Sequence, residues 1–434
     1  MALNRIPEEL LVIIAEQLDK ASDINSLAQS NRPTYRVVNH LLYTNNIHRA
    51  NASALNWGAE HNSLSTIAKC FLAGAATREG WEAAPLAHAA KAGHNAAVAL
   101  LLSHGADPDS KDAETDQTPL YIASEHGYPA VCEKLLVAGA DINSRNQRTD
   151  QYTCNETPLH TAALHGHLPV AQLLINHDAD LNAPNDKGWV PLREGLRCED
   201  TEIQPRMVRL LLDAGAPVNG HADHPRVTPL LLASIRYDDE SVKTLLEAGA
   251  DPNARDWING TALIDSVIGY RRDSVRRLLE HGADVNARAN HGGRPLYLAA
   301  RYGDLETTSI LLDYGADIDQ PATSDEPALH VAALRNELET VRLLLRRGAN
   351  VDSLRPYGSS GFTALFLTAR CNSIDVARVL LEYGANPLAV SPLGNTPLDV
   401  AKEDGHDEMV SLFHEHMSIR GILEEGNGAN STPS

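Results

Sequence analysis

The chain has 434 residues, of which 43% are hydrophobic and 22% are charged, an ordinary composition for a folded protein. Its formal net charge of −20 argues against non-specific binding to nucleic acid or to an anionic membrane surface. No apolar run approaches the roughly 20 residues of a membrane span. The five scattered cysteines include no CxxC pair, which favours a reducing compartment, the cytosol or the nucleus.

Residues 1–50 are predicted to form a small domain of three helices. Pro7 suits the first position of a helix over residues 6–18, and Asp23 can cap a second helix. The five consecutive apolar residues at 10–14 point in nearly every direction around the first helix, which therefore needs burial on several sides. Two short companion helices cannot supply that burial, so a partner protein or the adjoining part of the chain must cover the exposed side.

Residues 6–32 resemble an F-box, with a proline near the start, an acidic-leucine-leucine step and an aspartate-led second helix. In that family the exposed apolar face binds the Skp adaptor of cullin–RING ubiquitin ligases. This chain departs from the pattern at Ile6, where leucine is usual, and at residues 33–35, where many members have a tryptophan. The resemblance implies that the adaptor-binding residues are Ile6, Pro7, Leu10, Leu11, Ile14 and Leu18.

From residue 51 onward, one sequence pattern recurs at intervals close to 33 residues. Each copy has a leucine that usually follows Thr-Pro, a pair of small residues, a second apolar run and a Gly-Ala close. A fixed period of this length is typical of a stacked repeat array, and motifs such as TPLH resemble the ankyrin repeat. The repeat leucines are Leu55, Leu86, Leu120, Leu159, Leu192, Leu230, Leu263, Leu296, Leu329, Leu365 and Leu398.

The resemblance predicts an all-α solenoid of about eleven helix-turn-helix units with finger loops over residues 51–417, preceded by the F-box-like domain at 1–50. A flexible tail is expected at 418–434, and the atypical first and last units are expected to act as caps. Threonine and proline should start each first helix. The glycines expected in the left-handed conformation that ends each second helix are Gly215, Gly282, Gly315, Gly348 and Gly384.

Three units depart from the regular spacing. We expect four extra residues between the two helices of one unit, around residues 199–205. The finger loop at residues 145–156 is six residues longer than usual, and the loop at 355–362 is three residues longer. Such insertions are expected at loops, because the helices themselves must keep their stacking contacts.

No motif for catalysis stands out. The sequence lacks a phosphate-binding glycine loop, a dinucleotide fingerprint and an HExxH zinc motif, so we expect neither enzymatic activity nor a cofactor. His160, His165 and His167 could be grouped as a metal site, but a structural role is favoured because His160 belongs to a TPLH motif and His167 to a turn. His414 and His416 are expected on a solvated helix face.

The expected binding surface is the concave face of the array, where positions five and six after each repeat leucine lie at the rim. Arginines recur there although the net charge of the chain is −20. The planar guanidinium pairs with carboxylate or phosphate through two hydrogen bonds, so the row predicts binding of an acidic or phosphorylated target. The residues of this predicted surface are Arg197, Arg236, Arg301, Tyr302, Arg335 and Arg370, with Trp189 and Trp257 on finger loops. Arg145, Arg148, Arg255, Arg288 and Arg355 add charge to the finger loops.

The alternative for these arginines is that they pair with acidic residues of neighbouring units and remain solvated. For the whole chain, an adaptor-binding box joined to a recognition array predicts a non-catalytic substrate receptor of an SCF-type ubiquitin ligase. The alternative is a plain ankyrin scaffold or inhibitory binding protein, in which residues 1–50 only pack on the repeat that begins at Leu55. A regulator that occludes an enzyme is a third possibility.

Overall fold

The structure is a computed structural model that describes residues 53–72, 85–112, 115–146, 155–220, 227–236, 238–290, 292–321, 326–354, 361–391 and 393–419. The predicted adaptor-binding positions between residues 6 and 18 lie outside the described residues, as does the tail from residue 420.

Twenty-two helices, α4 to α25, form eleven consecutive pairs, and no strand occurs in the described part of the chain. Contacts divide the chain into unit 1, Met1–Pro225, and unit 2, Arg226–Ser434. In unit 1 the helices are α4 (Ser53–Glu60), α5 (Leu64–Leu72), α6 (Pro85–Lys91), α7 (Asn95–Ser103), α8 (Pro119–Glu125), α9 (Pro129–Val137), α10 (Pro158–Leu164), α11 (Leu168–Asn176), α12 (Pro191–Gly195) and α13 (Ile203–Asp213). In unit 2 they are α14 (Pro229–Ile235), α15 (Asp239–Glu247), α16 (Ala262–Ile268), α17 (Arg272–Glu280), α18 (Pro295–Arg301), α19 (Leu305–Asp313), α20 (Ala328–Leu334), α21 (Leu338–Arg346), α22 (Ala364–Cys371), α23 (Ile374–Glu382), α24 (Pro397–Glu403) and α25 (Asp407–Ile419).

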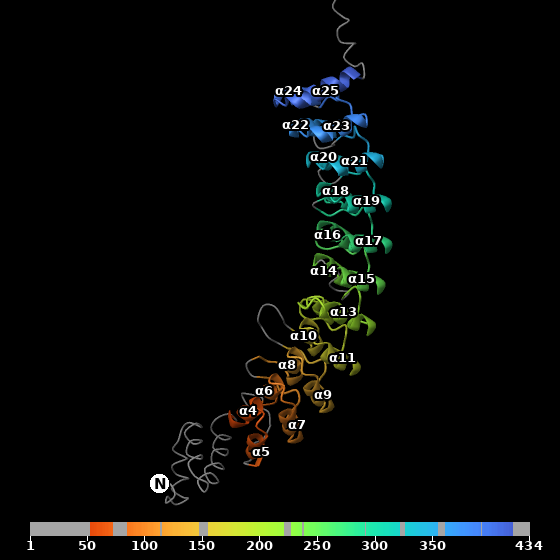
Figure 1. The fold of residues 1–434 in the computed structure, drawn as a ribbon. Helices are drawn as coiled ribbons and strands as arrows, with labels where there is room; N and C mark the ends of the chain where they lie inside the picture. Colours follow the sequence, from red (N-terminus) through yellow and green to blue (C-terminus); the bar gives the residue numbers. More distant parts are fainter. Residues whose placement is uncertain are drawn as a thin grey trace, which may run out of the picture. The chain divides into compact units, whose positions relative to one another are not determined.

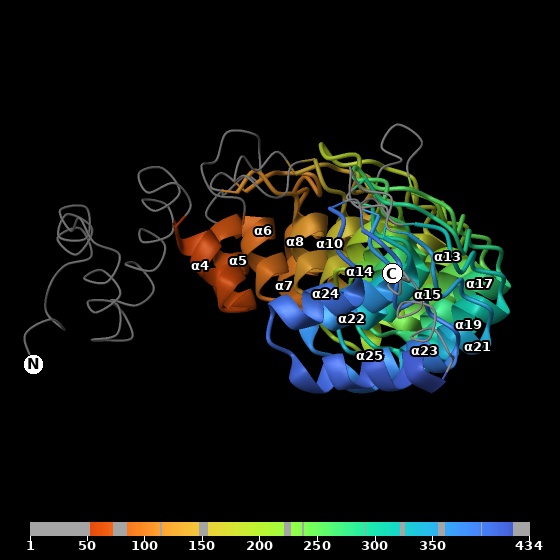
Figure 2. The same ribbon diagram turned by 90° about the horizontal axis from the view of Figure 1, so that it is seen from above.

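Within each unit the pairs stack in chain order. In unit 2 the first helices α14, α16, α18, α20, α22 and α24 form one layer, and the second helices form the other (Figure 1). Each first helix contacts its own second helix and the first helix of the next pair. The loops that connect successive pairs of unit 2 extend from one edge of these layers (Figure 2). The predicted all-α repeat array is therefore confirmed for the described residues.

The helix ends follow the predicted chemistry. Thr118, Thr228 and Thr363 each cap a first helix, with Oγ1 accepting a hydrogen bond from the backbone N–H three residues later at 3.3 Å. Proline occupies the first turn of most first helices, where its missing N–H costs nothing. The five glycines predicted to end second helices have φ between +83° and +95°, which confirms their left-handed conformation.

The core lies between the stacked pairs. All eleven repeat leucines are buried, with exposed fractions of at most 9%. The alanine pairs, such as Ala299 and Ala300, are fully buried, and their small size lets successive first helices approach closely. Leu311 and Leu344 of the second helices are also fully buried, so each unit obtains its core only together with its neighbours.

A ladder of hydrogen bonds joins the connecting loops of successive repeats. In the described loops, an Asp or Asn side-chain oxygen repeatedly accepts from a backbone N–H about one repeat later, as in Asn143 Oδ1 with Asp180 N (3.0 Å) and Asn286 Oδ1 with Asp317 N (3.0 Å). Pro217 occupies the corresponding position after Asn182 and has no N–H, so this rung cannot form.

Two departures from regular spacing lengthen helices rather than loops. Part of the insertion expected between two helices extends α13, which starts at Ile203 and has 11 residues against 9 in most second helices. Asp200 Oδ1 accepts from the backbone N–H of Ile203 and so fixes this start. At the other end, α25 has no terminating glycine and runs for 13 residues to Ile419.

Candidate binding surface

Four of the predicted arginines lie at the ends of first helices in unit 2, five residues after the repeat leucine (Arg301, Arg370) or six residues after it (Arg236, Arg335). Arg301 ends α18 and Arg370 lies in the last turn of α22, while Arg236 and Arg335 directly follow α14 and α20. All four side chains are exposed. We call these four residues the arginine row. Because first helices pack directly on one another, the ends that carry these residues follow each other along one edge of unit 2.

None of the four arginines forms an ion pair with a described residue. Two acidic residues close to the row in sequence, Asp239 and Asp304, are engaged by other arginines. Asp239 accepts a hydrogen bond from Arg271 Nε at 3.1 Å, and Asp304 lies 3.0 Å from Arg272 Nη2. In the described residues these four arginines are thus exposed to solvent and make no ion pair with an acidic residue of a neighbouring repeat.

The role of Asp304 explains why Arg301, three residues away, has no partner. Asp304 caps α19 and accepts from the hydroxyl of Thr307 at 2.7 Å. Burial alone would raise the pKa of Asp304, but the hydrogen bonds from Thr307 and Arg272 outweigh it and hold the pKa below its usual value. The carboxylate is therefore charged and buried, and Thr307 and Arg272 are its partners.

Apolar side chains accompany the arginine row. Ile235, Tyr302 and Leu334 are exposed next to its members, with Tyr302 38% exposed. Tyr270 lies in the turn after α16 and its ring is 5.7 Å from that of Tyr302. The surface therefore offers positive charge and apolar area together, a combination enriched at protein–protein contacts.

The sign of the charge changes at the last repeat. At the corresponding positions of the last repeat, Glu403 ends α24 and Asp404 follows it. Both are exposed and have no ion pair to a described residue. Arg370 of the preceding pair is thus the last arginine of the row. This reversal gives the surface a defined end.

In unit 1 the predicted residues are used differently. Arg197 pairs with Glu194 of α12 at 2.7 Å, and the Arg197 guanidinium lies 5.3 Å from the centroid of the Trp189 ring. The guanidinium of Arg193 lies 3.7 Å from the centroid of the Trp189 ring, so the half-buried indole is covered by cations of its own repeat. The structure thus places Arg197 and Trp189 in an internal cluster rather than in a row that matches unit 2.

The predicted finger-loop residues are distributed along both units. Trp257 is 67% exposed at the tip of the loop before α16. Arg255 donates to the backbone oxygen of Arg288 at 3.2 Å, which joins two successive loops. Arg145 donates to the backbone oxygen of Pro184 at 2.6 Å. Arg148 and Arg355 lie outside the described residues.

A family model for ankyrin repeats in three copies matches residues 55–146, 120–222, 230–322 and 329–422. The chain belongs to the ankyrin repeat family. Its matched ankyrin repeats begin at Leu55, so the match does not include residues 1–50. No curated protein matches the chain in sequence.

Two buried carboxylates of unit 1, Glu156 and Glu194, were not predicted from the sequence. Glu156 Oε2 accepts from the hydroxyl of Tyr121 at 3.3 Å, and Glu194 Oε2 is held by Arg197, while the second oxygen of each carboxylate is buried without a partner. Burial, followed by the charge of Glu194, raises the pKa of Glu156 to about 7. For Glu194 the sequence does contain a signal, because most other repeats of this chain carry an apolar residue at that position, such as Leu298 and Val331.

The histidines considered as metal ligands serve the fold. His160 is buried, its Nδ1 accepts from the backbone N–H of Thr157 at 3.1 Å, and its Nε2 donates to the backbone oxygen of Trp189 at 2.9 Å. Burial lowers the pKa of His160 to about 4, so the ring is neutral. His167 Nε2 contacts the backbone oxygen of Glu125 at 2.9 Å. Among the described residues, no group of three His, Cys, Asp or Glu side chains could hold a metal ion.

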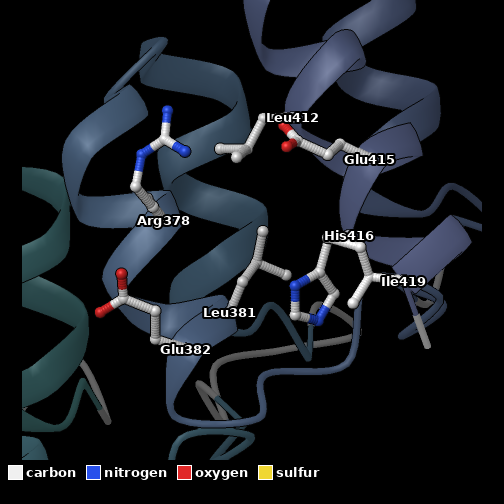
Figure 3. Close-up of a pocket in the computed structure, with 7 residues that line it drawn as sticks. All are labelled: Arg378, Leu381, Glu382, Leu412, Glu415, His416 and Ile419. Carbon is white, nitrogen blue, oxygen red and sulfur yellow. The ribbon is translucent and has the colours of Figure 1, made fainter.

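One hollow lies between the last two second helices of unit 2, away from the arginine row. Leu381 and Glu382 of α23 face His416 and Ile419 of α25 across it, and Arg378 lies at its edge (Figure 3). It mixes exposed apolar and charged groups without a convergent set of polar atoms. In the part of the chain that the structure describes, no helix combines the length and apolar composition needed to cross a bilayer.

Replacing the buried carboxylate Glu156 by the neutral amide, Glu156→Gln, is expected to change the pH dependence of stability. The folded-state pKa of Glu156 lies above its unfolded value, so its neutral form stabilises the fold at low pH and this contribution is lost as pH rises through about 7. From pH 5 to pH 8, the wild-type protein should lose roughly 1–3 kcal/mol of unfolding free energy relative to Glu156→Gln. Urea denaturation of both proteins at several pH values measures this difference.

The control for that experiment is Glu199→Gln, which neutralises an exposed carboxylate in the same unit. Its stability should follow the wild-type pH profile. If Glu156→Gln also follows the wild-type profile, the buried carboxylate does not take up a proton in this pH range.

Proposed function

We propose that this ankyrin repeat chain is a non-catalytic protein-binding module that holds an acidic or phosphorylated segment of a target protein on the arginine row of unit 2. One observation carries the proposal: four exposed arginines at equivalent helix ends have no ion pair in the described structure. In the second-helix layer, Arg272 and Arg347 pair with Asp304 and Asp313 of neighbouring repeats, whereas Arg346 and Arg378 are exposed without an ion pair to a described residue. The row is distinguished by its recurrence at the ends of first helices, beside exposed apolar side chains such as Tyr302 and Leu334.

An unpaired arginine row is better suited to binding than to stability. A single exposed ion pair contributes only about 0–1 kcal/mol, because solvent screens it and both side chains lose freedom. Charge-assisted hydrogen bonds to one continuous segment are stronger, about 1.5–3 kcal/mol each where they are shielded from water. Tyr302 and Leu334 beside the row supply apolar surface that would provide such shielding.

The proposal includes no catalytic step because the buried polar side chains of the described residues are used for contacts within the fold. The buried histidines, His160 and His330, bridge to backbone oxygens of the next repeat at 2.9 and 3.0 Å and are not poised for proton transfer. The carboxylates of Glu156 and Glu194 are buried inside the repeats. Ankyrin repeats serve in general as interaction scaffolds, and the rows of equivalent side chains here suit that role.

A finer proposal concerns residues 1–50. We propose that their first predicted helix binds a Skp-type adaptor, so that a target on the arginine row would be brought to a cullin–RING ubiquitin ligase. The support is the F-box-like pattern over residues 6–32 and the five consecutive apolar residues at 10–14, which need a covering surface. The competing role of residues 1–50 is to cover the first ankyrin repeat at Leu55.

Charge reversal of two members of the row, Arg301→Glu with Arg335→Glu, is expected to weaken binding of a fluorescein-labelled glutamate-rich peptide by at least about tenfold, which corresponds to about 1.4 kcal/mol. The reason is that two attractive contacts become repulsive while the buried core is untouched. Fluorescence anisotropy with the full chain at low and moderate salt measures the change, and added salt should weaken the wild-type complex.

The matched control is Arg346→Glu with Arg378→Glu, which reverses two exposed arginines on the second helices α21 and α23. It makes the same change in net charge and should retain most of the binding. Equal losses in the two double variants would show that net charge, and not the arginine row, attracts the peptide.

The adaptor proposal is tested by co-purification of the full chain with a purified Skp-type adaptor, compared with a variant in which Leu10, Leu11 and Ile14 are replaced by Ala. The wild-type chain should retain the adaptor and the variant should not, because the apolar face is removed. The anisotropy assay with the glutamate-rich peptide serves as the folding control. No retention by the wild-type chain, or equal retention by both, contradicts the adaptor role and leaves the arginine row unaffected.

A further inference from the structure

We propose that the segment bound by the arginine row lies in the polyproline II conformation, with every third side chain facing unit 2. The proposal rests on the function proposed above and adds the conformation and side-chain order of the occupant. It commits to one occupant, an acidic extended segment of a partner protein, because the exposed charges of the row are positive and have no ion pair in the described structure.

The spacing of the row carries the argument. First helices that pack directly on each other have axes about 8–10 Å apart, so the helix ends that carry Arg301, Arg335 and Arg370 recur at about that distance. A polyproline II segment has three residues per turn and a rise of about 3.1 Å, so side chains three residues apart lie on one face about 9 Å apart. The interval between facing side chains of such a segment therefore matches the interval between successive first helices.

A β-strand does not match in the same way. Its side chains return to one face every second residue, at about 6.6 Å, so carboxylates would move out of step with the arginines after one repeat. An α-helix returns to one face after seven residues, at about 10.5 Å, but it is about 10 Å wide and presents its backbone far from the row. The slim extended segment is the better fit to residues such as Arg301 and Arg335, which follow one another at the edge of a helix layer.

The turns that carry the row are held firmly in place. Gly303, which follows Tyr302, has φ of +68°, and a Cβ at this position would clash with the carboxylate of Glu337 in the next repeat. Asn336 and Asn372 take the same left-handed position after α20 and α22, with φ of +59° and +56°. A surface with fixed spacing loses little freedom on binding, which favours an occupant of matching period.

Tyr270 occupies the turn position that is held by glycine or asparagine in the next three repeats. Its φ is +56°, a conformation that a tyrosine rarely adopts, in the position where Gly303 stands one repeat later. The ring is 52% exposed and lies beside Tyr302. Strain in an exposed aromatic residue brings no stability, so it indicates that the ring is placed there to contact something.

The row therefore has a definite order of chemistry along unit 2. From α14 to α24 it presents Arg236, then the apolar pair Ile268 and Tyr270, then Arg301, Arg335 and Arg370, and finally Glu403 and Asp404. A matching segment carries an acidic residue, an apolar residue, three acidic residues and a basic residue, each separated from the next by two others. Proline and small residues between them favour the polyproline II conformation.

The test uses the full chain and labelled peptides of one composition in three arrangements. In the first, facing residues are three apart in the order above. In the second, they are two apart, and in the third they are seven apart in an alanine-rich helical background. Each arrangement is made in both chain directions. The period-three peptide, in its better direction, should bind at least about tenfold more tightly than the other two, a difference of about 1.4 kcal/mol.

The variant Tyr270→Gly tests the apolar position separately. Glycine suits the positive φ of this turn, so folding should be preserved or improved while the ring is removed. Binding of the period-three peptide should weaken severalfold, whereas the same peptide with serine at its apolar position should bind the wild-type chain and the variant equally. An equal effect on both peptides contradicts the apolar contact.

The outcomes separate this inference from the proposed function. If all three arrangements bind equally and Arg301→Glu with Arg335→Glu abolishes them, the conformation is wrong and the acidic-segment function stands. Tighter binding of the period-two or period-seven peptide also overturns the polyproline II assignment. If no peptide binds, or binding is insensitive to those arginines, both the function and the inference are wrong.

Discussion

Close stacking of each helix pair on the next is the interaction on which the rest of the structure depends. No pair encloses a core alone: the repeat leucines and the alanine pairs are buried only because a neighbouring pair covers them. The same stacking fixes the interval between equivalent surface residues. The spacing of Arg301, Arg335 and Arg370 is therefore a consequence of core packing, and the surface pattern is as rigid as the core that sets it.

Charge is distributed over this scaffold in two ways. In the second-helix layer, Arg272 and Arg347 pair with acidic residues of adjacent repeats and so join the stack. At the ends of the first helices of unit 2 the arginines have no such partners, because carboxylates such as Asp304 are already committed to caps and to other arginines. A chain with a net charge of −20 thus keeps one exposed positive row that its own acidic residues do not neutralise.

Much of the fold follows from the sequence because its determinants are local or periodic. Thr-Pro pairs such as Thr228–Pro229 start first helices, and glycines such as Gly282 end second helices. The period of the repeat leucines predicts that the helix pairs stack on one another. Pairings between repeats could not be predicted in this way, since they depend on side-chain directions. Arg197 and Arg301 occupy the same position of their repeats, yet Arg197 forms an ion pair with Glu194 of its own repeat and Arg301 forms none with a described residue. The positive φ of Tyr270 could not be predicted from the sequence either, because it depends on the geometry of the turn.

Two exposed tyrosines of unit 2 provide the most direct test of the account. Tyr302 lies beside Arg301 of the arginine row and Tyr314 follows the second helix α19, and their exposed fractions are 38% and 40%. Each is replaced in turn by the photo-crosslinker p-benzoylphenylalanine, and the full chain is irradiated with the glutamate-rich peptide. The account predicts that the peptide is crosslinked from position 302 and not from position 314. Equal crosslinking from both positions, or crosslinking from position 314 alone, would contradict the assignment of the binding surface to the arginine row.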